Sequence, residues 1–133
     1  MRYFILSISL FLMACGTQKS QTNLKNVSDY INIVSPPPFG EVSETLIITG
    51  EARGVYFFEG DFPVEIITED GNKIDHYATA QGEWMTEDFV PFRFEYDISD
   101  LAPQEILVKF HRNNPSDDRS LDMVLELPLI ITK

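Results

Sequence analysis

Strict alternation of apolar and charged residues defines the fold of this chain. Over residues 92–98 every second residue is apolar, which is the period of a β-strand with one buried face, so Phe92, Phe94, Tyr96 and Ile98 are expected to point inward. Further segments are rich in β-branched residues or alternate in the same way, and turn-forming residues separate them. These segments are residues 30–34, 45–52, 63–69, 73–78, 106–111 and 121–127. No long run of helical period interrupts them, so the sequence predicts an all-β fold of about seven strands.

The turns between these segments indicate how the strands are arranged. Asp70-Gly71 is a strong hairpin signal, so residues 63–69 and 73–78 are expected to pair antiparallel. The three prolines at 36–38 cannot donate ladder hydrogen bonds, and we expect them to carry the chain from one sheet to the other. A polyproline ligand for a partner is the functional alternative. The pattern favours an immunoglobulin-like β-sandwich over residues 30–133, without an internal disulfide because the chain has one cysteine.

Aromatic residues are concentrated in residues 54–63, and we expect them to fill the core of the sandwich. A single domain without disulfides needs large apolar side chains inside, so we expect Phe58 and Trp84, the only tryptophan, to be buried. The alternative is a flat platform on which sugar rings stack, which would make Trp84 a contact residue. The rings of that platform would be Tyr56, Phe57, Phe58, Phe62 and Trp84.

The candidate contact residues come from the same region. Tyr56 and Phe57 are adjacent, and neighbouring residues of an extended chain face opposite sides, so one of the two rings is expected to point outward. That ring, together with Met85 and Phe89, is the predicted contact surface. Glu59 stands beside a glycine, and its carboxylate is expected to fix a turn by accepting hydrogen bonds from backbone N–H groups.

The N-terminal residues have the pattern of a bacterial lipoprotein signal. An apolar run of about eleven residues follows Arg2 and is too short to span a bilayer as a helix. The tetrapeptide Leu12-Met13-Ala14-Cys15 resembles the lipobox, which predicts removal of residues 1–14 and attachment of lipid to Cys15. The polar residues 15–29 are expected to form a flexible tether. Gly16, where an aspartate would favour retention in the inner membrane, favours the outer membrane in bacteria that have two.

The charge of the chain limits its partners. Asp and Glu number 21 against 10 Lys and Arg, for a net charge of -11, which disfavours nucleic acid and anionic lipid surfaces, so any membrane attachment is expected to be covalent or hydrophobic. The only histidines, His76 and His111, stand on separate predicted strands, and we expect no nucleophilic catalysis and no metal site. The many carboxylates leave a glycosidase pair as an alternative. We expect no enzyme and no cofactor.

Several short motifs occur in order along the predicted domain. They are residues 33–36, 50–54, 57–64, 80–85, 89–92 and 114–116. In these motifs the chain resembles the Gmad-type, germination-associated immunoglobulin-like domain of bacterial envelope lipoproteins. The resemblance implies the fold, an envelope location and no known catalytic residues. Because there is room for one domain only, the germination role is not carried over. We expect a lipid-anchored, non-enzymatic domain that contacts a protein or the cell wall, with a carbohydrate- or peptidoglycan-binding module as the alternative.

Overall fold

The structure, a computed structural model, describes residues 26–133 and is built of β-strands. Eight strands are joined by short loops and by three single-turn 3-10 helices. The strands are β1 (Ile31–Ser35), β2 (Gly40–Val42), β3 (Thr45–Arg53), β4 (Asp61–Ile67), β5 (Lys73–Ala80), β6 (Phe89–Asp97), β7 (Gln104–His111) and β8 (Val124–Ile131). The 3-10 turns are η1 (Val27–Asp29), η2 (Gly54–Tyr56) and η3 (Arg119–Leu121). Among these residues no helix has the length and apolar character needed to cross a membrane.

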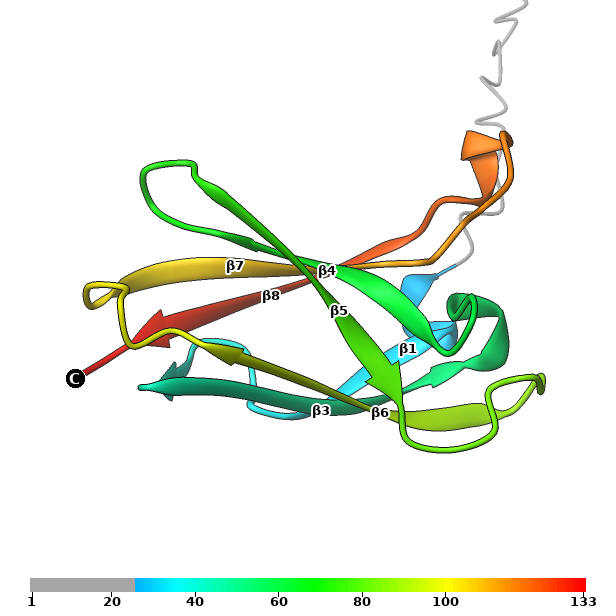
Figure 1. The fold of residues 1–133 in the computed structure, drawn as a ribbon, viewed down its shortest axis with the longest axis horizontal. Coiled ribbons are helices and arrows are strands. Elements are labelled where there is room, and N and C mark those ends of the chain that lie inside the picture. The colour runs from blue at the N-terminus through cyan, green and yellow to red at the C-terminus, as the bar shows by residue number, and fades with distance from the viewer. Residues whose placement is uncertain (1–25) are drawn as a thin grey trace, which may run out of the picture.

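The strands form two layers that pack face to face (Figure 1). One layer has the order β1-β3-β6 and the other the order β5-β4-β7-β8-β2. All neighbouring pairs are antiparallel except β2 and β8, which run parallel. The two layers are connected by β5, which pairs with β4 along Lys73–Thr79 and with β6 only through Thr79 and Ala80. The expected all-β, immunoglobulin-like sandwich and the hairpin at Asp70-Gly71 are confirmed.

The prolines at 36–38 separate two strands that lie in different layers. The strand before them, β1, pairs with β3, whereas β2 after them pairs with β8. The expected crossing between sheets is therefore confirmed. The strand β2 itself was not expected, which is why the fold has eight strands and not about seven.

Two segment boundaries differ from expectation. Residues 27–29 belong to the fold and not to the tether, because η1 is capped by the Asn26 side chain and Val27 packs against the core. The last strand begins at Val124 and not at residue 121, because residues 119–121 form η3. The expected signal, Cys15 and the tether up to residue 25 lie outside the described residues.

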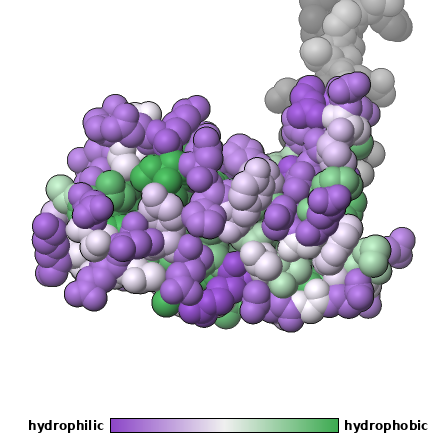
Figure 2. All heavy atoms as spheres, viewed as in Figure 1, coloured by the Kyte–Doolittle hydropathy of each residue, from purple (hydrophilic) through white to green (hydrophobic). Residues whose placement is uncertain are grey.

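The core lies between the layers and consists of the inward-facing residues of the alternating strands. On β6 the side chains of Phe92 and Phe94 are fully buried, Ile98 is buried just after the strand, and Tyr96 packs at the core's margin. The ring of Phe62 is at the centre, with ring centroids of four other aromatic residues within 6.5 Å. On the face that Figure 2 shows, the surface is mostly hydrophilic, with some hydrophobic residues visible between the polar ones. This arrangement follows from the period-2 pattern of the sequence.

Candidate functional site

Three loops meet at one end of the sandwich, and we call this region the loop end. They are residues 54–60, 81–88 and 112–123. Figure 1 shows them at the end where the described chain begins. The first loop lies between the other two: the Gly54 N–H donates to the Asp88 carbonyl at 3.2 Å, and the Asn113 N–H donates to the Tyr56 carbonyl at 2.9 Å. Four of the six motifs noted in the sequence include residues of these loops, so they shape this region.

The phenol of Tyr56 links the first loop to the adjacent sheet. Its ring is fully buried, and its hydroxyl donates to the Phe110 carbonyl at 2.6 Å, with the Met123 carbonyl at 3.5 Å. Burial raises the pKa of the phenol well above its usual value, and the positive charge of Arg112 opposes this shift more weakly. Tyr56 is therefore a buried structural anchor.

Replacing Tyr56 with phenylalanine is expected to lower the free energy of unfolding by about 1–2 kcal/mol at pH 7, because a buried hydrogen bond is lost. Since the folded pKa is raised, the unfolded wild type ionises first, and its stability falls as the pH rises above about 10. The Tyr56→Phe variant lacks this ionisation, so the difference between the two proteins should narrow between pH 9 and pH 11. Urea unfolding at several pH values measures this, and a constant difference would contradict it.

The expectation that one ring of Tyr56 and Phe57 points outward is wrong, since both are buried. The reason is that residues 54–56 form the 3-10 turn η2, which breaks the two-residue alternation of an extended chain. The exposed positions are Val55 and Phe58 instead, with 45% and 42% of their surface exposed. The expectation that Phe58 is buried is also wrong. Of the two apolar residues assigned to the core, only Trp84 packs against it, and it is partly buried.

The Glu59 side chain is exposed, and the turn that contains it is held by its backbone. The N–H groups of Phe58 and Asp61 donate to each other's carbonyls at 2.9 and 3.3 Å. The two residues between them, Glu59 and Gly60, have positive φ angles of 53° and 84°, as in the tight turns of hairpins. Within residues 26–133 the Glu59 carboxylate accepts no hydrogen bond, so the expected role of the carboxylate is wrong.

The remaining contact candidates lie on the other side of the first loop. Met85 is the most exposed of them, at 73%. Phe89 is partly covered by Arg53, whose guanidinium carbon lies 4.4 Å from the ring centroid. Arg53 also donates to the carbonyls of Asp29 and Glu87, at 2.8 and 3.1 Å. Arg53 therefore ties the start of the domain to the second loop.

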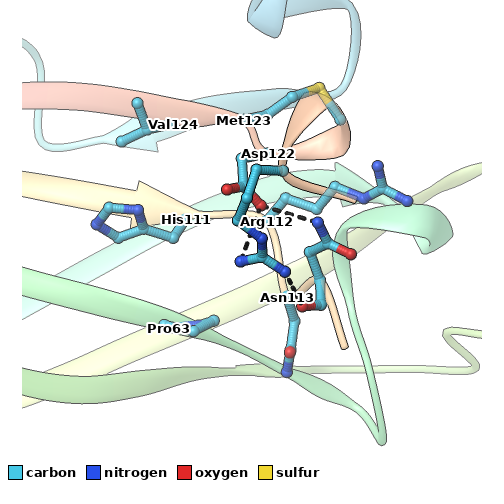
Figure 3. Close-up of a pocket in the computed structure, with 9 residues that line it drawn as sticks. Pro63, His111, Arg112, Asn113, Asp122, Met123 and Val124 are labelled. Atoms are coloured by element: carbon cyan, nitrogen blue, oxygen red, sulfur yellow. Dashed lines mark hydrogen bonds and ion pairs between the residues drawn. The ribbon is translucent and has the colours of Figure 1, made fainter. Parts of the chain in front are cut away.

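The third loop is held by a polar network that the sequence analysis did not predict. The Arg112 guanidinium donates to the carbonyls of Val55 and Leu121, at 3.2 and 2.8 Å. The Asn114 amide donates to the Asp122 carboxylate at 2.8 Å. Arg112, Asn114 and Asp122 line an open pocket. Figure 3 shows Arg112, Asn113 and Asp122 close together there, with His111 and Pro63 to one side. The sequence signal for this loop was the turn-forming dipeptide Asn114-Pro115.

The polar groups of the loop end hold the loops in place. The polar side chains of the pocket donate to neighbouring carbonyls and carboxylates of the same loops. His111 lies at 4.0 Å from the Glu65 carboxylate and so forms only a long ion pair when protonated. Within the described part of the chain, no three His, Cys, Asp or Glu residues come close enough together to hold a metal ion.

The two-layer fold and its loop end define an immunoglobulin-like domain, a class that generally serves as a binding module. The sequence model of the Gmad2 family, the immunoglobulin-like domain of bacterial spore germination, matches residues 30–119. The chain therefore belongs to the Gmad2 family, and the resemblance noted in the sequence is confirmed. No curated protein matches the chain.

Proposed function

We propose that this protein is a lipid-anchored, non-enzymatic interaction domain of the bacterial cell envelope, held at a membrane through Cys15. The observation that carries the proposal is the short separation between the lipobox and the compact domain. Only ten residues, 16–25, lie between Cys15 and Asn26, where the domain begins. Ten residues reach at most about 35 Å when fully extended. A lipid on Cys15 would keep the loop end near the bilayer and leave the sheet faces available to a partner.

A protein partner is favoured over a sugar by the positions of the aromatic rings. Of the five rings of the platform considered above, Tyr56, Phe57 and Phe62 are buried in the core. Only Phe58 and the partly buried Trp84 remain near the surface, which is too little for a flat stacking platform. The absence of enzyme activity is part of the proposal. It is supported by the polar groups of the loop end, whose hydrogen bonds hold the loops in place.

Replacing Cys15 with serine is expected to move the protein from the membrane fraction to the soluble fraction, because serine cannot accept the lipid. The wild type should sediment with membranes and incorporate labelled palmitate, and the variant should do neither. Two or three acyl chains hold a protein firmly, at roughly 0.8 kcal/mol for each buried CH₂. Ser20→Ala, in the same polar segment, is the control and should behave as the wild type. A Cys15→Ser protein that still sediments with membranes would contradict the anchor.

A further inference from the structure

An apolar row crosses the outer face of the larger layer, outside the loop end. In the strand register Ile67 lies opposite Leu107, and Leu107 lies opposite Pro128. The N–H of Phe39, the residue before β2, donates to the Pro128 carbonyl at 2.7 Å and continues the line. We call Phe39, Ile67, Leu107 and Pro128 the apolar row. The next residues along each strand are buried in the core, so the row faces outward, and its members line one shallow hollow.

Phe39 differs from the other members of the apolar row in its exposure and its backbone conformation. Its side chain is 64% exposed, although phenylalanine is normally buried. Its backbone is also in the left-handed region, with a φ of 61°, which is disfavoured for a residue with a large side chain. Glycine or asparagine would fit this conformation better. A strained residue that displays an aromatic ring to solvent indicates a functional position.

The two borders of the row differ in charge. On one side Lys109 forms an ion pair with Glu126 at 3.6 Å, and Lys73 with Glu65 at 3.9 Å. The other border has three carboxylates, on the outward positions next to the row. They are Glu41, Glu69 and Glu105. Within residues 26–133 no lysine, arginine or histidine forms an ion pair with any of the three. The Glu69 carboxylate accepts a hydrogen bond from the Glu105 N–H at 3.1 Å, but no basic side chain of the described residues neutralises the charge of this border.

We propose that the apolar row is the docking site for a protein segment that presents an apolar side chain between lysine or arginine residues. The apolar side chain occupies the hollow between Phe39 and Leu107, and the basic residues pair with the acidic border. This inference rests on the proposed function and adds to it the surface that binds and the kind of partner. A second copy of the chain is a poor occupant, because the net charge is -11 and the same acidic border would face it. Anionic lipid is repelled for the same reason.

The proposal is tested with peptides selected from a random display library on the full chain, purified in mild detergent. Selected peptides should carry an aromatic or aliphatic residue flanked by lysine or arginine. Their affinity should fall at least tenfold for Phe39→Asn and should weaken as salt is raised. Asparagine tolerates the left-handed backbone, so this variant should be as stable as the wild type or more stable. An effect on binding without a loss of stability separates docking from a structural role.

Two further variants provide a control and a test of the acidic border. Val34→Asn removes another exposed apolar side chain, on β1 in the other layer, and should leave peptide affinity unchanged. Glu41→Gln should reduce affinity and flatten the salt dependence. The proposal is overturned if selected peptides lack basic residues, if they bind Phe39→Asn as well as wild type, or if none is enriched. It is also overturned by a dimer or by vesicle binding that Phe39→Asn abolishes. Peptide binding does not depend on lipid at Cys15, so failure of the anchor is detected separately.

Discussion

Replacing Gly54 with alanine is expected to destabilise the domain strongly, by roughly 3 kcal/mol. A Cβ at this position would lie 1.9 Å from the Thr86 carbonyl oxygen and 2.3 Å from that of Trp84. Both atoms belong to backbone and cannot rotate away, so the first and second loops would have to separate. Urea unfolding followed by the fluorescence of Trp84 measures the change.

Gly82→Ala is the matched control for this prediction. It lies in the second loop, and a Cβ there would meet no atom within 4 Å. Its free energy of unfolding should stay within about 0.5 kcal/mol of the wild type. Equal stability of the two alanine variants would mean that the loops are not in backbone contact at Gly54.

Replacing Phe62 with alanine is expected to cost about 3–5 kcal/mol, because it leaves a cavity at the centre of the core. The Phe62 ring is fully buried, and its centroid lies 5.1 Å from that of Tyr56 and 5.0 Å from that of Phe92. Phe58→Ala, only four residues earlier, is the control. Its side chain is 42% exposed, so a smaller loss of about 1 kcal/mol is expected. Similar losses for the two variants would show that burial does not distinguish these rings.

The strands could be predicted from the sequence because their pattern is local. In β6 each inward residue is two positions from the next, and this period needs no knowledge of the partner strand. The short strand β2 could not be predicted in the same way. It has three residues, it follows three prolines, and it is defined only by its parallel pairing with β8, about ninety residues further along the chain.

The candidate site was harder to predict because its geometry depends on distant contacts. The burial of both Tyr56 and Phe57 could not be deduced from the two-residue alternation of a strand, because the 3-10 turn that ends at Tyr56 breaks this alternation. Likewise, Arg112 and Asn113 have ordinary loop composition. They acquire their roles by bonding to Val55 and Tyr56, more than fifty residues earlier. Such contacts leave no periodic signal in the sequence.

The crossing of β5 between the layers has a consequence for solubility. Because β5 meets β6 only at Thr79 and Ala80, the rest of its outer edge has no neighbouring strand within the described domain. Such an edge is a template for aggregation when many copies are crowded together. Here the edge is blocked: the Tyr77 N–H already donates to Nδ1 of His76 at 2.7 Å, and Lys73 and Asp75 place charges along it. These features of the β5 edge are expected to oppose strand-to-strand pairing between copies.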